Sequence, residues 1–90
     1  MATEQGWLVY LLRCADGSLY TGITNDLARR LRAHESGRGS RYTRSRLPVE
    51  PVWTRPCASR GEALRLEARI KRLPAARKRR LVIEGRFPDD

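Results

Sequence analysis

The sequence is poor in cysteine and has no long apolar run. Its two cysteines, Cys14 and Cys57, stand far apart and without the spacing of metal ligands, so a disulfide framework is not indicated. Both lie in apolar, strand-like stretches, and we expect buried free thiols. The longest apolar stretch near the N-terminus, "WLVYLL", is too short for a signal peptide or a membrane span. These shortages favour a cytoplasmic protein without a membrane partner.

Lysine and acidic residues are also scarce. All but two of the 19 Lys and Arg residues are arginines, and with only 10 acidic residues the net charge is +9. Such a basic chain indicates a polyanionic partner, most often nucleic acid. The planar guanidinium also suits bidentate phosphate contacts. The length of 90 residues fits a single domain, with a core over about residues 7–73 and a basic C-terminal helix over about residues 74–84.

The apolar pattern predicts three strands. Trp7–Cys14 is apolar on both faces, which is typical of a central strand with layers packed on each side. Ser18–Gly22 is a second predicted strand, and Val49–Cys57 is a third. Pro51 predicts that the third strand lies at the edge of a sheet, because proline cannot donate a ladder hydrogen bond.

Three helices complete the predicted order, β-β-α-β-α-α. The first is capped by Asn25 or Asp26 and runs to about Glu35. The second follows the capping-box pattern "SRGE", and the third is the basic "AARKRRLVIEG". The buried residues are expected to be Ala63, Leu66, Ile70 and Leu73 in the second helix, and Leu81, Val82 and Ile83 in the third. Between the first helix and the third strand, "SGRGSRYTRSRLP" is predicted to be a mobile, phosphate-facing loop.

The register of the first hairpin decides whether two tyrosines share a face. With a two-residue loop, Tyr10 and Tyr20 point to opposite faces, because side chains alternate along a strand. With a three-residue loop ending at Gly17, Tyr10 lies opposite Gly22 and both tyrosines share one face. The residues alone leave both registers open.

A candidate site gathers around the first predicted helix. Arg30 and His34 are four residues apart and lie on one helix face. Tyr20 and Gly22 end a strand just before the helix begins, where the backbone can approach an anion closely. With Tyr10 they form a possible catalytic set, although each residue taken singly also fits an ordinary half-buried or surface position.

Glu67 and two basic segments are further candidates. Glu67 is either a surface carboxylate paired with Lys71 or a ligand of Mg²⁺, which takes one or two carboxylates plus phosphate and water. The run from Arg77 to Arg80 fits a solvated face. The predicted loop suits phosphates and a stacked base, and its candidate nucleic-acid-binding residues are Arg38, Arg41, Tyr42, Arg44 and Arg46.

The sequence resembles the GIY-YIG nuclease superfamily, and specifically its small stand-alone bacterial members. The resemblance rests on "VY", nine residues, "YTG", then "NDLARRL" and later "EALRLEARIKRL", from Trp7 to about Leu73. It implies an α+β fold in which helices flank a small three-stranded antiparallel sheet. It also implies divalent-metal-dependent cleavage of phosphodiester bonds. Because both tyrosines line one site in this family, the resemblance favours the three-residue hairpin loop.

The family's functional residues match positions of this chain one by one. The resemblance implies two motif tyrosines, a closing glycine, a helix arginine and a metal-binding glutamate, which are Tyr10, Tyr20, Gly22, Arg30 and Glu67. His34 matches a histidine found in some branches. The chain departs from the pattern at Leu8, where the family has a glycine, and at Ile23, where some members have lysine. It also lacks an asparagine after the glutamate helix.

The resemblance implies a hydrolytic mechanism, stated here as a hypothesis. Glu67 would hold Mg²⁺ or Mn²⁺, and Arg30 would offset the charge of the transition state. Tyr10, made more acidic by metal and arginine, would take a proton from water together with His34, while Tyr20 would position water or phosphate. We therefore expect an endonuclease of DNA maintenance or repair, acting on DNA ahead of RNA. The alternative is a nucleic-acid-binding module that keeps the nuclease fold without cutting.

Overall fold

A computed structural model describes residues 6–85, so the first five and last five residues of the predicted domain lie outside the described residues. The fold is built on an antiparallel sheet of three strands in the order β2-β1-β3. The strands are β1 (Leu8–Arg13), β2 (Leu19–Thr24) and β3 (Glu50–Pro56). The predicted α+β class and three-stranded sheet are confirmed, and β3 lies at the sheet edge as Pro51 indicated.

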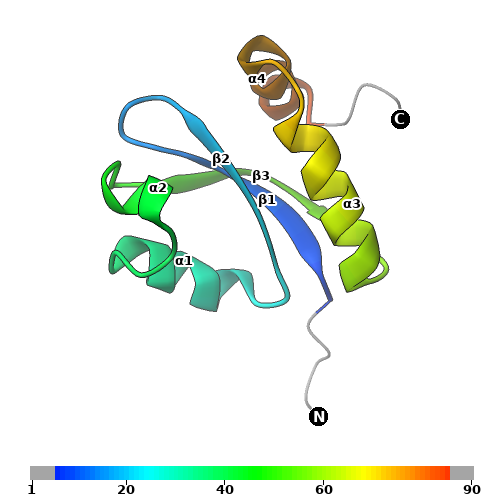
Figure 1. The fold of residues 1–90 in the computed structure, drawn as a ribbon, viewed down its shortest axis with the longest axis horizontal. Helices are drawn as coiled ribbons and strands as arrows, with labels where there is room; N and C mark the ends of the chain where they lie inside the picture. Colours follow the sequence, from blue (N-terminus) through cyan, green and yellow to red (C-terminus); the bar gives the residue numbers. More distant parts are fainter. Residues whose placement is uncertain (1–5, 86–90) are drawn as a thin grey trace.

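Helices cover both faces of this sheet. Figure 1 shows α1 (Leu27–Glu35) and α2 (Arg41–Arg44) on one side, and α3 (Arg60–Lys71) and α4 (Ala75–Glu84) on the other. The order matches the predicted β-β-α-β-α-α, with the single turn of α2 added inside the segment predicted to be a loop. None of the helices in the described part of the chain is long and apolar enough to cross a membrane.

The central strand β1 is buried on both faces, as its apolar pattern predicted. Val9 and Leu11 pack into one cluster with residues of α3 and α4, while Tyr10 and Leu12 pack into a second cluster that includes apolar residues of α1. Burial of a large apolar side chain contributes about 1.5–3 kcal/mol. The strand therefore holds the two helical layers together and places Tyr10 on the α1 side.

The hairpin between β1 and β2 has the three-residue loop. Tyr10 pairs with Gly22 and Leu12 pairs with Tyr20. Gly17 has a φ of 84°, a left-handed conformation that favours glycine. The register that the residues left open, and that the resemblance favoured, is confirmed, so Tyr10 and Tyr20 lie on one face.

The helix ends follow local capping signals. The side chain of Asp26 accepts a hydrogen bond from the Arg29 amide, and that of Ser59 accepts one from the Glu62 amide, satisfying amides that the helices leave free. Leu81 of α4 is buried, but Ile83 is 82% exposed. The prediction that Ile83 anchors α4 is wrong, because residues two apart on a helix point about 200° apart.

Both cysteines are free thiols. Cys14 is 4% exposed, as predicted, whereas Cys57 is only half-buried. Burial raises the pKa of both thiols, so neither is set up as a thiolate nucleophile.

Candidate active site

The site is centred on a buried tyrosine–histidine pair. The Tyr10 hydroxyl lies 2.9 Å from Nε2 of His34, and the two side chains are 1% and 0% exposed. Arg30 donates from Nε to the Tyr10 hydroxyl at 3.4 Å and from Nη2 to the Gly39 carbonyl at 2.8 Å. The structure thus brings together three of the predicted residues, Tyr10 from β1 and Arg30 and His34 from α1.

A second hydrogen bond holds the imidazole at its other nitrogen. Nδ1 of His34 lies 2.8 Å from Oγ1 of Thr43, which itself lies 2.9 Å from Oγ of Ser40. A neutral imidazole has one N–H donor and one lone pair, so it donates at one of its two contacts and accepts at the other. In the tautomer that carries its proton on Nδ1, Thr43 accepts from Nδ1–H and Nε2 accepts from the Tyr10 hydroxyl.

The segment carrying Thr43 corrects the predicted loop. It contains the one-turn helix α2, capped by the Ser40 side chain, which accepts from the Thr43 amide at 3.0 Å. Thr43 is fully buried against His34. The predicted mobile loop is instead a helical turn that hydrogen-bonds His34 through Thr43.

Two glycines make room for the site's side chains. A methyl group on Gly22 would overlap the Tyr10 hydroxyl, and one on Gly39 would overlap the His34 ring and lie 2.7 Å from its Cα. Gly22 is buried against Tyr10, and its role in the close approach of an anion stays a prediction. Both positions keep the tyrosine–histidine pair in contact with the backbone around it.

Gly39→Ala is expected to destabilise the protein by about 1–3 kcal/mol, the usual cost of overpacking a filled space. Because the overlap involves His34 backbone as well as its ring, a rotamer change alone does not relieve it. Urea unfolding followed by circular dichroism measures the change.

Gly61→Ala is the matched control for this substitution. An added methyl group there meets only Nη1 of Arg65 at 3.4 Å and Oγ of Ser59 at 3.9 Å. It also lies inside α3, where alanine is favoured over glycine. A stability loss at Gly61 as large as that at Gly39 would contradict the tight contact with His34.

Burial sets the ionisation of the pair. It lowers the pKa of His34 below its ordinary value of 6.5, and the nearby Arg30 cation lowers it further, so the imidazole is neutral at neutral pH. Burial also raises the pKa of Tyr10, more than the hydrogen bond from Arg30 lowers it. In the protein without metal the effect of Arg30 is thus smaller than that of burial, and the acidification of Tyr10 by metal and arginine together stays a hypothesis.

Aromatic rings extend the site beyond this pair. The Tyr20 ring lies 5.3 Å from the His34 ring and 6.4 Å from the Tyr10 ring, measured between centroids. The Tyr20 ring also stacks with the ring of Tyr42 in α2, at 6.0 Å between centroids. Tyr20 is thus part of the predicted cluster, and Tyr42 lies at its margin.

Glu67 belongs to α3, and its charge reaches the site. It raises the pKa of Tyr10, after the larger effects of burial and of the Tyr20 charge. Its carboxylate lies 3.3 Å from Nζ of Lys71, the i, i+4 pair weighed from the sequence, and its side chain is 17% exposed. Within residues 6–85 no three His, Cys, Asp or Glu residues cluster as a metal site. A single carboxylate fits Mg²⁺ held with phosphate and water, and does not fit an all-protein metal cage.

The other predicted nucleic-acid-binding arginines divide into two groups. Arg38 donates to Oγ of Ser36 at 3.2 Å, and Arg46 donates to Asp16 at 2.9 Å while its guanidinium lies 3.9 Å from the Tyr42 ring centroid. Arg41 and Arg44 are exposed.

A recess of about 320 Å³ opens beside Arg30, between the end of β2 and α1.

The comparison with known protein families agrees with this arrangement. A family model described as the GIY-YIG catalytic domain matches residues 6–80. The chain belongs to the GIY-YIG family. This GIY-YIG domain is 55% identical over 75 residues to a UPF0213 protein of Nitratidesulfovibrio vulgaris, a match covering 83% of the chain and 68% of the relative. It is 46% identical to a UPF0213 protein of Cupriavidus pinatubonensis, covering 87% of each.

Solved structures support the fold of this GIY-YIG domain. A solution structure of a UPF0213 protein from Bacillus halodurans is 43% identical, has a TM-score of 0.59 and covers 93% of this chain and 89% of its own. A solution structure of a protein from E. faecalis is 36% identical, with a TM-score of 0.63 and coverage of 93% and 90%. The small bacterial single-domain group indicated by the sequence is confirmed.

Three residues of the site were missed from the sequence of this GIY-YIG domain. Gly39, Ser40 and Thr43 buttress His34 and Arg30 through the contacts described above. The spacing of Ser40 and Thr43 matches an N-cap and its third helical position, which is the signal that could have revealed the helical turn.

Proposed function

We propose that the protein is a metal-dependent endonuclease that hydrolyses phosphodiester bonds in nucleic acid, DNA ahead of RNA, in DNA maintenance or repair. One observation carries the proposal. A fully buried imidazole is hydrogen-bonded to the hydroxyl of a tyrosine that an arginine also contacts. A purely structural core has little use for three such polar groups, since burying them is costly. Membership of the GIY-YIG family supports the same reading.

Proton transfer would begin at Tyr10. Its raised pKa keeps the phenol protonated at neutral pH, so it would act as a relay and not as a preformed phenolate. As water attacks phosphorus, its proton would pass to the Tyr10 oxygen while the phenol proton passes to Nε2 of His34, 2.9 Å away. The bond to Thr43 would keep the imidazole in the orientation that accepts this proton.

Arg30 would offset the charge that develops on phosphate. The bond from Nη2 to the Gly39 carbonyl fixes its guanidinium beside Tyr10, which is the pre-organisation that makes such stabilisation effective. Among the loop arginines, we propose the exposed Arg41 and Arg44 as the phosphate contacts. Arg38 and Arg46 have partners within the protein.

Glu67 would be the protein ligand of Mg²⁺ or Mn²⁺, with substrate phosphate and water completing the set. The bound metal supplies Lewis-acid stabilisation of the charged phosphate. The ion pair between Lys71 and Glu67 would break when the cation binds. Such a pair on a helix surface is weak, and Lys71 is half exposed.

A cleavage assay tests the proposal. Single-stranded, duplex and branched DNA and the matching RNAs are incubated with the protein in Mg²⁺, in Mn²⁺ and in chelator. We expect cutting only with metal, and a loss of about 10²–10³-fold in Arg30→Ala, as for removal of a donor to transition-state charge. Binding of these substrates without any cutting would instead establish the non-catalytic module. Cutting that survives Arg30→Ala unchanged would point to a contaminating nuclease.

The rate is expected to fall on the acid side only below pH 6.5, because His34 must be neutral to accept the proton and its pKa is lowered from 6.5. The measurement is kcat/KM for cleavage against pH, which reports the ionisation of the free enzyme. An acid limb centred above 6.5 would contradict the role of a depressed histidine.

A further inference from the structure

A second recess lies at the tip of the hairpin, away from Arg30. It has a volume of about 400 Å³ and is larger than the recess beside Arg30. Its walls come from three elements that are distant in sequence: the β1–β2 loop, α2 and α4. The lining side chains that bear on its chemistry are Asp16, Ser18, Tyr42, Lys78 and Arg79.

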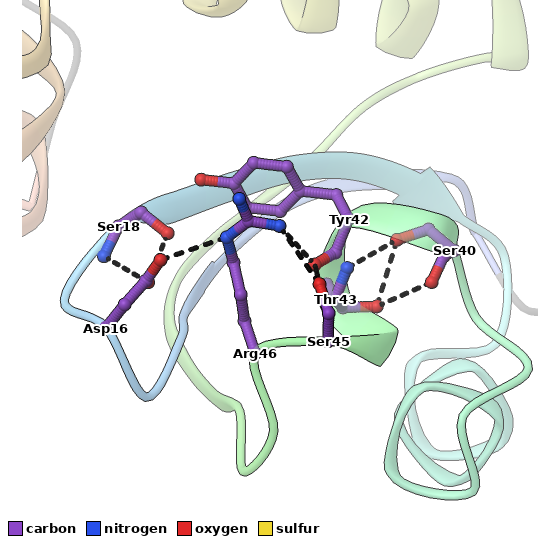
Figure 2. A network of polar contacts seen from close by, with 7 residues as sticks. All are labelled: Asp16, Ser18, Ser40, Tyr42, Thr43, Ser45 and Arg46. Carbon is purple, nitrogen blue, oxygen red and sulfur yellow. Dashed lines mark hydrogen bonds and ion pairs between the residues drawn. The ribbon is translucent and has the colours of Figure 1, made fainter.

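The one acidic residue that lines this recess already has hydrogen-bond partners within the protein. Asp16 accepts from the Ser18 hydroxyl at 2.6 Å and amide at 3.0 Å, and its other oxygen accepts from Arg46 at 2.9 Å. Figure 2 shows Arg46 between this carboxylate and the Tyr42 ring. These bonds hold the pKa of Asp16 below its usual value, Ser18 having the largest effect. Asp16 therefore fixes the loop and is not available to a cation.

The two cations of the recess lack such a partner. Lys78 is half-buried and Arg79 is exposed, and neither makes a hydrogen bond or ion pair with another side chain in residues 6–85. Their neighbour Arg80, outside the recess, does have one, donating to Glu84 at 3.0 Å. An anion in the recess would supply the counter-charge that these two cations lack.

We propose that this recess binds a backbone phosphate of a nucleic-acid strand that passes the candidate active site. The inference rests on the proposed function only in taking nucleic acid as the ligand. Tyr42 connects the two places, because it lines the recess and stacks with Tyr20, whose ring contacts His34. The strand would run from the catalytic cluster past Tyr20 and Tyr42 to Lys78 and Arg79. The run from Arg77 to Arg80, interpreted from the sequence as a solvated face, then divides into two functional residues and two solvated ones.

Two double variants of α4 test this proposal. Lys78→Gln with Arg79→Gln removes the recess cations, while Arg77→Gln with Arg80→Gln removes the same charge from the same helix outside the recess. Affinity for a fluorescent single-stranded oligonucleotide is measured in chelator over a range of salt concentrations. The recess variant is expected to bind about tenfold more weakly, with a salt slope lower by about 0.7 because one backbone phosphate is no longer neutralised. The control variant should keep a slope close to that of the parent.

The outcomes separate this inference from the nuclease proposal. Equal losses in both variants would overturn it, because net charge alone would then explain them. Selective loss in the recess variant supports it even if no cleavage is ever seen, since the binding is measured without metal. As a second measurement on the unaltered protein, ¹H–¹⁵N spectra should show Ser18 and Lys78 amide shifts on adding the oligonucleotide. Shifts with inorganic phosphate but none with oligonucleotide would contradict a nucleic-acid site.

Discussion

Glu67→Gln is expected to lower the cleavage rate by about a thousandfold or more while leaving nucleic-acid binding in chelator unweakened. A metal ligand contributes several kcal/mol of transition-state stabilisation, and each 1.4 kcal/mol is about tenfold in rate. Binding should persist because the substitution removes a negative charge from a basic protein of net charge +9. Cleavage under single-turnover conditions and fluorescence anisotropy measure the two quantities separately.

Glu84→Gln is the matched control for this prediction. Glu84 makes the same kind of i, i+4 ion pair, with Arg80 at 3.0 Å, as Glu67 makes with Lys71 at 3.3 Å. Its pair lies on α4, and Glu84 is not among the groups with the largest effects on the ionisation of Tyr10. The control should cut at the parent rate. If Glu67→Gln also cut at that rate, Glu67 would be an ordinary surface carboxylate and the metal would need another ligand.

Tyr10→Phe is expected to lower the rate by about 10²–10⁴-fold, the usual contribution of a positioned proton-transfer group. The substitution keeps the ring that fills the core and removes only the oxygen shared with His34 and Arg30. It also leaves Nε2 of the buried His34 without a donor, which costs about 1–3 kcal/mol of stability. Single-turnover cleavage and urea unfolding give the two effects.

Tyr20→Phe distinguishes the roles of the two tyrosines. Tyr20 contacts the His34 ring edge-on at 5.3 Å, and within residues 6–85 the hydrogen bond to Nε2 comes from Tyr10. Its substitution should therefore reduce the rate without removing the acid limb set by His34. If Tyr10→Phe cut normally and Tyr20→Phe did not, the proton relay would have to be reassigned to Tyr20.

The fold was largely accessible from the sequence because its signals are local. A strand apolar on both faces predicted the central position of β1, and Pro51 predicted an edge strand. The hairpin register was not accessible from the residues, because a strand with two apolar faces looks equally well buried in either register. The resemblance to the GIY-YIG family favoured the correct register, because both tyrosines line one site in that family.

The site was accessible only in part. Tyr10, Tyr20, Arg30 and His34 form one cluster, as the motifs implied. Thr43 was missed because its place in the site depends on a hydrogen bond to His34, which is nine residues away across a turn. The composition of this segment led to the prediction of a loop, because glycine, serine and arginine are typical of loops. The depressed pKa of His34 could not be predicted either, because burial is a property of the assembled fold.

Neighbouring residues of α2 face in two directions. Thr43 points inward to the imidazole, while Tyr42 lines the recess at the hairpin tip. The one-turn helix is also tied to the hairpin through Arg46, which bonds to Asp16 and to the Tyr42 carbonyl. In the proposed nuclease, a bound strand that holds Tyr42 in place would therefore also hold Thr43 and the His34 ring that it contacts. Binding of the strand and orientation of His34 would then be coupled through this one helical turn.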